Sequence, residues 1–263
     1  MAPADNRDRE HPLDVQEFYD RLAPDYDAMT GFDQRFVRET PFFRLLVERY
    51  NIKSALDAGC GSGFHSLLLS QLGVQVTAVD ASPEMLRLTA KHARKARVKV
   101  KALKGSFVDL GELLKGPFDA IFVMGNSLAH LLSRDDLKKA VRSFSRLLST
   151  EGVLFMQCLN YERILAAREK VLSIKEADGK KFVRSYDYDD KGILFNIQTV
   201  ERGISGGEGK SEKIRLRPVI RDELVSVLVE ERLPHVNLYG GISMEPFSPS
   251  KSNDLVVLAR KNT

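Results

Sequence analysis

The sequence predicts an α/β fold in which helices cover both faces of a mostly parallel sheet. The strongest signal is at 54–63, where a short apolar run leads directly into a glycine-rich turn. Leucines at helical spacing follow at 64–72, and the next apolar run, at 74–79, ends in an aspartate. Residues 118–124 are almost wholly apolar, as in a strand buried on both faces. This order of elements is typical of an open, doubly wound sheet.

Length and composition fit one globular domain. The 263 residues can bury a single large core, and 43% hydrophobic with 29% charged residues is ordinary for such a domain. The net charge of +4 is mildly basic, but the densest basic run, at 91–97, continues a helix. A solvated helix face is the favoured interpretation, so no nucleic-acid partner is expected. Cys60 and Cys158 give neither a disulfide framework nor a zinc spacing, so no metal is expected.

We expect this domain to consist of a core and two additions. Residues 1–14 are polar, which predicts disorder and no secretory signal, and 15–50 form a helical cap. The core comprises 51–179, an antiparallel insertion 180–219, and the completion of the core 220–263. No apolar run approaches membrane-spanning length, so a cytoplasmic protein is expected. Its oligomeric state stays open, a homo-oligomer being one alternative.

The glycine turn favours a particular kind of ligand. Its spacing is G-x-G-x-G, and Phe64 stands where a dinucleotide site needs its third glycine, so a pyrophosphate site is disfavoured. Asp80 ends the neighbouring strand, where a pair of ribose hydroxyls would lie. Ser82 then caps the helix that runs to about residue 96.

The string DAGCGSG followed by VTAVDAS resembles motifs one and two of the class I S-adenosylmethionine-dependent methyltransferases. The resemblance implies a Rossmann-like sheet of seven strands in the order 3-2-1-4-5-7-6, with S-adenosylmethionine as cofactor and S-adenosylhomocysteine as product. It also implies a set of contacts to the methyl donor from the loop and the next strand: Asp57, Ala58, Gly59, Cys60, Gly61, Gly63, Asp80 and Ala81.

The same resemblance implies further contacts to the methyl donor. Tyr19 and Tyr26 lie in a segment similar to the Y-D-x-x-A-x-x-Y-D lid of many small-molecule methyltransferases, and Arg38 could pair with the donor carboxylate. Plain helix packing is the alternative for these residues. Adenine contacts are implied for the first turn after Ser82 and for the loop after the third strand, and sulfonium contacts for the end of the fourth strand: Met85, Ser106, Phe107 or Val108, Met124 and Gly125.

The string GNSLAH after the fourth strand resembles the glycine and glycine/sarcosine N-methyltransferases. The N/D-P-P-Y/F tetrapeptide of enzymes that methylate base amines is absent, which disfavours base methylation. His130 is a candidate for contacts to donor and acceptor, or else a structural histidine. Asn126 could bind the acceptor, or else serve turn chemistry.

The end of the fifth strand resembles the R-N-Y-D string of the same enzymes. Asn160 and Tyr161 match it, whereas Leu159 replaces the arginine that grips the glycine carboxylate, so glycine as substrate is in doubt. Arg184 or Arg217 could supply the missing cation.

The insertion reads as a hairpin at 180–202, a loop at 203–209 and a further strand at 213–219. Tyr186, Tyr188 and Arg184 share one side of a strand and could wall an acceptor site, the alternative being an ordinary hairpin face. Tyr239, at a later strand end, could also face the site.

These patterns predict a methyltransferase that acts on a small molecule, and the favoured reaction is N-methylation of an amine or amino acid by in-line methyl transfer. His130, Tyr161 and Asn126 are the candidate catalytic residues, and no general base stands out. The alternatives are an O- or C-methyltransferase, a non-catalytic S-adenosylmethionine-binding protein and, more remotely, a nicotinamide-dependent dehydrogenase.

Overall fold

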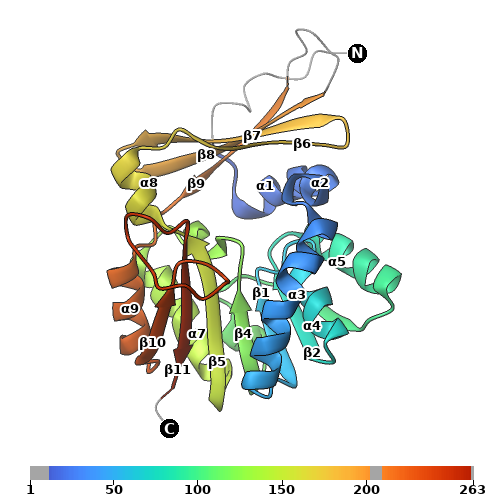
Figure 1. Cartoon of the computed structure of the whole chain (residues 1–263), viewed down its shortest axis with the longest axis vertical. Helices are drawn as coiled ribbons and strands as arrows, with labels where there is room; N and C mark the ends of the chain where they lie inside the picture. The colour runs from blue at the N-terminus through green and yellow to red at the C-terminus, as the bar shows by residue number, and fades with distance from the viewer. Residues whose placement is uncertain (1–11, 202–208, 262–263) are drawn as a thin grey trace.

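The computed structural model describes residues 12–201 and 209–261. Of the disorder predicted for 1–14, residues 1–11 fall outside these residues, as does most of the loop predicted for 203–209. The prediction was wrong for 12–14, where Leu13 forms a bridge to Ile214. The described chain forms a seven-stranded central sheet and a separate four-stranded antiparallel sheet (Figure 1). It contains no helix with the length and apolar character that a membrane crossing requires.

The central sheet has the strand order β10-β11-β5-β4-β1-β2-β3, which confirms the predicted 3-2-1-4-5-7-6 topology. The five strands from β5 to β3 are parallel, β11 runs antiparallel to β5, and β10 runs antiparallel to β11. The strands are β1 Ser54–Ala58, β2 Gln75–Asp80, β3 Val100–Lys104, β4 Phe118–Val123, β5 Leu148–Leu159, β10 His235–Tyr239 and β11 Asp254–Arg260.

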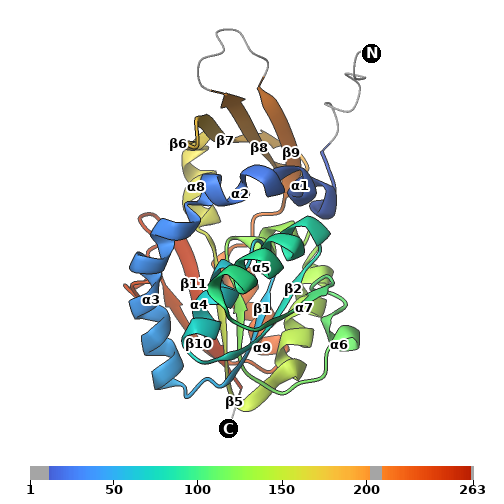
Figure 2. The same cartoon turned by 90° about the vertical axis from the view of Figure 1, so that its right-hand side faces the viewer.

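Helices cover both faces of this sheet (Figures 1 and 2). One face carries α3 Phe32–Arg49, α4 Phe64–Gln71 and α5 Pro83–Ala96, and the other carries α6 Leu110–Leu113, α7 Arg134–Leu147 and α9 Arg221–Glu230. Neighbouring residues of β4 point to opposite faces: Ile121 packs on the side of α7, and Phe122 packs on the side of α3. This explains why β4 is apolar from Ala120 to Val123.

The antiparallel sheet comprises β6 Val171–Ala177, β7 Lys180–Asp189, β8 Gly192–Glu201 and β9 Lys210–Leu216. The hairpin of β7 and β8 lies where the sequence predicts it. Strand β6 was not predicted: the sheet begins at Val171, in a region assigned to the core. Helix α8 Tyr161–Ala167 connects β5 to this sheet.

The amino-terminal cap lies between the two sheets (Figures 1 and 2). It consists of α1 Val15–Leu22, a single 3-10 turn Ala23–Asp25 and α2 Tyr26–Thr30. Phe18 and Leu22 on α1 are buried against apolar residues of the antiparallel sheet. Just before α1, the Leu13 amide donates to the Lys213 carbonyl oxygen on β9 at 2.9 Å, which ties the cap to the insertion.

Candidate active site

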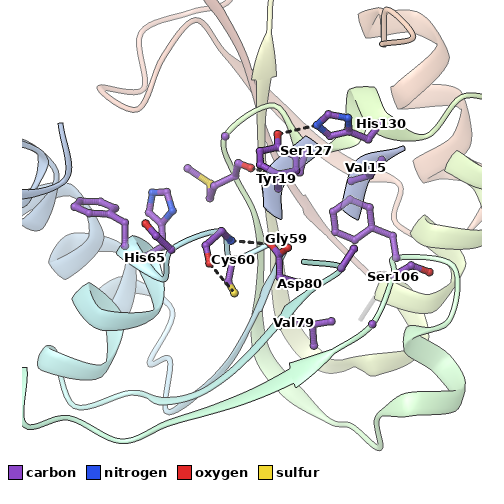
Figure 3. A pocket seen from close by; sticks show the side chains of 18 of the residues that line it. Val15, Tyr19, Gly59, Cys60, His65, Val79, Asp80, Ser106, Ser127 and His130 are labelled. Carbon is purple, nitrogen blue, oxygen red and sulfur yellow. Dashed lines mark hydrogen bonds between the residues drawn. The ribbon is translucent and has the colours of Figure 1, made fainter. Parts of the chain in front are cut away.

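A first cavity of about 200 Å³ lies where the cap covers the carboxyl ends of β1, β2 and β4 (Figure 3). Ligands of open α/β sheets bind at this edge of the sheet. The residues predicted to contact the methyl donor that line this cavity are Tyr19, Tyr26, Gly59, Cys60, Gly61, Asp80, Ala81, Ser106, Phe107, Val108, Met124, Gly125 and His130.

The glycine loop comes close to its surroundings through backbone alone. Gly59 has φ +73°, and a Cβ there would lie 2.9 Å from the Ser127 hydroxyl and 3.0 Å from the Phe107 ring. Gly61 has φ +55°, and a Cβ there would lie 3.3 Å from the Tyr26 hydroxyl. Larger residues would therefore narrow the cavity as well as strain the loop.

Asp80 fixes this loop from the end of β2. Its carboxylate accepts hydrogen bonds from the amides of Gly61 at 2.8 Å and Ser82 at 2.9 Å. Burial raises the pKa of Asp80, although these two hydrogen bonds act in the opposite direction. The carboxylate thus lines the cavity where the sequence predicts a contact to ribose.

Four of the predicted contact residues support the loop from behind and do not line the first cavity. Ala58 and Met85 are fully buried in the core, and Gly63 begins α4 at φ +86° with Thr89 packed against it. Asp57 is also buried, and its Oδ2 accepts from the Ser66 hydroxyl at 2.6 Å. Its Oδ1 has no partner, and burial raises its pKa.

Helix α3 supplies a different arginine from the predicted one. The Arg38 side chain is 70% exposed and reaches only the second cavity described below. Arg35, one helical turn earlier, lines both cavities, stacks over the Phe64 ring at 3.9 Å and donates to Glu39 at 2.8 Å. Residues three apart share a helix face, so the sequence indicated the face but not the residue.

Other residues lining the first cavity were also missed. They come from several elements that are far apart in the sequence, so no single motif identifies them: Val15, Ser62, Phe64, His65, Val79, Gly105, Ser127 and Leu131.

His130 and Tyr19 meet above the glycine loop (Figure 3). The Tyr19 hydroxyl lies 2.9 Å from Nε2 of His130, whereas Nδ1 of the same ring is buried and has no partner. Burial lowers the pKa of His130 to about 4, so its imidazole is neutral near pH 7. Burial also raises the pKa of Tyr19 well above its ordinary value.

A second cavity, of about 1050 Å³, adjoins the first and extends beneath the antiparallel sheet. The two cavities share six lining residues: Tyr19, Tyr26, Arg35, Met124, Gly125 and His130. Of the residues predicted to bind the acceptor, Asn126, Arg184 and Tyr186 line the second cavity. The remaining three, Asn160, Tyr161 and Tyr239, line neither cavity among the described residues.

Contacts within the protein account for the side chains of Asn160 and Asn126. The Asn160 amide donates to the carbonyl oxygens of Pro249 at 2.8 Å and Ser252 at 2.9 Å, which holds a loop against the end of β5. Asn126, at φ +70°, donates to the Tyr161 hydroxyl at 2.8 Å and accepts from the Leu159 amide at 3.1 Å. This geometry matches the turn-chemistry alternative for Asn126.

Three further candidates are placed as follows. Tyr239 packs on the apolar cluster beside α3. The Tyr188 hydroxyl donates to the Glu169 carbonyl oxygen at 2.5 Å. Arg217 is held by Glu223 at 2.8 Å and by the Leu131 carbonyl oxygen, so it does not replace the missing arginine.

Comparisons with known proteins agree with this geometry. A family described as a methyltransferase domain matches residues 55–152. The glycine/sarcosine N-methyltransferase of Halorhodospira halochloris is 27% identical over 243 residues, which cover 90% of this chain and 86% of the relative. The ubiquinone biosynthesis O-methyltransferase of Xanthomonas oryzae is 37% identical over 105 residues, which cover 40% of this chain and 42% of the relative.

The fold also matches a solved structure, the CcbJ methyltransferase from Streptomyces caelestis. The TM-score is 0.78 at 23% identity, with 95% of this chain and 100% of that chain covered. Together with the predicted motifs, the strand order and the cavity over the glycine loop, these matches give one conclusion. The chain contains a methyltransferase domain and is an S-adenosylmethionine-dependent methyltransferase that acts on a small molecule.

Proposed function

We propose that the enzyme transfers a methyl group to the nitrogen of a small amine held in the second cavity, from S-adenosylmethionine held in the first. The observation that carries this proposal is the common wall of the two cavities, where Tyr19, Gly125 and His130 lie. Because the two cavities adjoin at these residues, a methyl donor in the first and an acceptor in the second would lie next to each other.

The first cavity fits the adenosyl and methionine parts of the methyl donor. Asp80 would accept from the ribose hydroxyls, and Phe107 would cover the adenine. The Arg35 guanidinium would bind the donor carboxylate, and the backbone at Gly59 and Gly61 leaves room for the ligand. Bound there, S-adenosylmethionine supplies an electrophilic methyl group.

His130 would orient the acceptor amine. Its neutral ring carries one proton, so when Nε2 donates to the Tyr19 hydroxyl, Nδ1 presents a lone pair. An amine N–H hydrogen-bonded to Nδ1 would aim the nitrogen lone pair at the methyl group. With a pKa of about 4, His130 is too weak a base to hold the ammonium proton, so its role is positioning. Alignment of two reactants can contribute about 7–11 kcal/mol to a bimolecular reaction.

The comparisons favour nitrogen over oxygen as the acceptor atom. The glycine/sarcosine N-methyltransferase match covers 90% of this chain and so includes the elements around the second cavity. The O-methyltransferase match covers only 40% of this chain, so it bears on a smaller part. O-methylation is the second candidate because that shorter match has the higher identity.

Product analysis tests the proposal. The enzyme would be incubated with methyl-labelled S-adenosylmethionine and matched amines, alcohols and phenols, and the labelled atom located by NMR. We expect label on nitrogen, and a transfer rate that falls about 10-fold in His130→Gln with unchanged S-adenosylmethionine affinity, since a lost positioning contact costs about 1.4 kcal/mol. Label found only on oxygen or carbon would overturn N-methylation.

A further inference from the structure

We propose that the acceptor carries an acidic group, bound by Arg184 and Lys175 on the antiparallel sheet. This inference rests on the proposed function, because it assigns a substrate class to the second cavity. Both side chains line that cavity, and neither lines the first.

The two cations lie side by side because of the strand register. Arg184 on β7 pairs with Ser173 on β6, and its Nε donates to the Ser173 hydroxyl at 2.6 Å. Lys175 is two residues further along β6, so its side chain lies on the same face of the sheet. Its Nζ would lie 2.7 Å from a Cβ at Gly31, so the glycine between α2 and α3 leaves space for the ammonium group.

These cations have no acidic partner in the part of the chain that the structure describes. Within residues 12–201 and 209–261, neither Arg184 nor Lys175 forms an ion pair. On the facing helix α3, Arg35 and Arg38 both pair with Glu39, so a single carboxylate offsets two guanidinium groups. The pKa of Lys175 is lowered by partial burial and then by the charges of Arg184, Arg35 and Arg38.

A bound anion would relieve this unbalanced charge. Bringing cations together in a partly buried cavity without a counter-ion is unfavourable, and the free energy is recovered when an anion binds. A guanidinium and an ammonium group suit a carboxylate, a phosphate or a sulfate group. Arg35 also lines the first cavity, so it is available to the methyl donor, whereas Arg184 and Lys175 remain for the acceptor.

The opposite charges in the second cavity set the direction of the acceptor. Glu245 and Asp254 also line it, and the pKa of Asp254 is raised by burial and by Glu245. These acids would repel an anionic group and attract the ammonium end of the acceptor, which must lose a proton to water or to one of these carboxylates before its nitrogen attacks the methyl group. The volume of about 1050 Å³ gives room for an acceptor whose amine and acidic group are several bonds apart.

Two matched pairs of amines test this inference. The acidic probes are 4-aminobutyrate and O-phosphoethanolamine, and the counterparts without an acidic group are butylamine and ethanolamine. Each would be titrated by calorimetry into the full-length enzyme saturated with S-adenosylhomocysteine, and assayed for methyl transfer. We expect the acidic member of at least one pair to bind about 10-fold more tightly than its counterpart, because a charged hydrogen bond contributes about 1.5–3 kcal/mol. The pair that shows this preference distinguishes a carboxylate from a phosphate ligand.

Variants assign the preference to the two residues. Arg184→Gln and Lys175→Gln should each abolish most of the preference for the acidic amine, while the affinity for S-adenosylhomocysteine stays unchanged. Lys181→Gln is the matched control, since Lys181 is exposed on the same strand as Arg184 but lies one residue out of phase, on the other face. Equal binding within both pairs, no binding by any probe, or equal effects of the Arg184 and Lys181 variants would overturn the inference. Binding of acidic amines without methyl transfer would instead count against N-methylation and leave the anion subsite standing.

Discussion

The Tyr19 hydroxyl lies 2.9 Å from Nε2 of His130, and this contact joins the cap to the turn after β4 at the boundary between the two cavities. Tyr19 belongs to α1 and His130 to the 3-10 turn Ser127–His130. Their rings also meet edge to face at a centroid distance of 5.4 Å. The orientation of the imidazole therefore depends on a residue far away in the sequence.

Tyr19→Phe should slow methyl transfer with little effect on binding of the methyl donor. The phenyl ring keeps the packing, but Nε2 of His130 loses its partner, so the ring orientation is no longer fixed. We expect kcat to fall about 10-fold, as for a lost hydrogen bond of about 1.4 kcal/mol, and the Kd for S-adenosylmethionine to stay within about twofold. Initial rates and calorimetry measure the two effects. An unchanged kcat would show that the hydroxyl has no part in positioning.

Asp80→Asn should weaken binding of the methyl donor. The asparagine side chain keeps the shape of the aspartate, but only its one oxygen accepts hydrogen bonds. It cannot accept from the backbone amides of Gly61 and Ser82 and also from the ribose hydroxyls, as a carboxylate with two oxygens does. A loss of about 1.5–3 kcal/mol corresponds to a Kd that rises about 10- to 100-fold, measured by calorimetry. Asp119→Asn is the control, because Asp119 holds Ser54 at the opposite end of the sheet. If both variants bind S-adenosylmethionine like the parent, Asp80 is not part of the site.

Gly61→Ala should lower both stability and affinity for the methyl donor. An alanine at φ +55° is strained by about 1–2 kcal/mol, and its methyl group would press on Tyr26. Gly73→Ala is a matched control: Gly73 has φ +88°, and a Cβ there meets nothing within 4 Å. Urea unfolding should show similar destabilisation of the two variants, whereas calorimetry should show weaker S-adenosylmethionine binding only in Gly61→Ala. Equal affinities would argue against a close approach of ligand and loop.

A pH-dependent ion pair holds the cap against the core. His92 on α5 has Nε2 at 2.9 Å from Asp27 on α2, and its Nδ1 donates to the Ser62 carbonyl oxygen at 2.8 Å. Both partners are acceptors, so a doubly protonated ring satisfies both. The hydrogen bond to Asp27 raises the pKa of His92. Burial acts to raise the pKa of Asp27, but hydrogen bonds from His92 and Ser62 outweigh it and the net shift is downward.

The sign of this pH dependence follows from the two shifts. Stability from a raised histidine pKa is fully present below the ordinary value of 6.5 and is lost as the pH rises through the folded-state value. Stability from a lowered aspartate pKa is present above the ordinary value of 3.8 and is lost as the pH falls. The pair is therefore strongest between these values. His92→Gln should destabilise the protein by about 1 kcal/mol at pH 5.5 and by less at pH 8.5, measured by urea unfolding. If the loss of unfolding free energy in His92→Gln were the same at both pH values, the ion pair would be contradicted.

The methyl-donor side of the molecule could be predicted because its signals are local. The turn at Gly59 and Gly61 and the strand end at Asp80 lie within a short stretch, where strand, turn and helix patterns fix the backbone. Arg35 was missed in favour of Arg38 because helical periodicity defines a face, whereas the identity of the residue that reaches the cavity depends on how α3 packs.

The acceptor side could be predicted only in part because distant segments build it. The alternation of apolar and polar residues in strand β6 is short, so it is a weak strand signal. The strand is at the edge of the antiparallel sheet, where it pairs with β7. Asn160 matched a motif, yet its amide is occupied by carbonyl oxygens of Pro249 and Ser252, almost a hundred residues later. Such pairings depend on tertiary packing and leave no periodicity in the sequence.

Helix α1 closes the donor cavity on one side and walls the acceptor cavity on the other, with the backbone at Leu13 bonded to β9. Lifting it would open both cavities at once, so a single movement of the amino-terminal helix would expose the donor and the acceptor to solvent together.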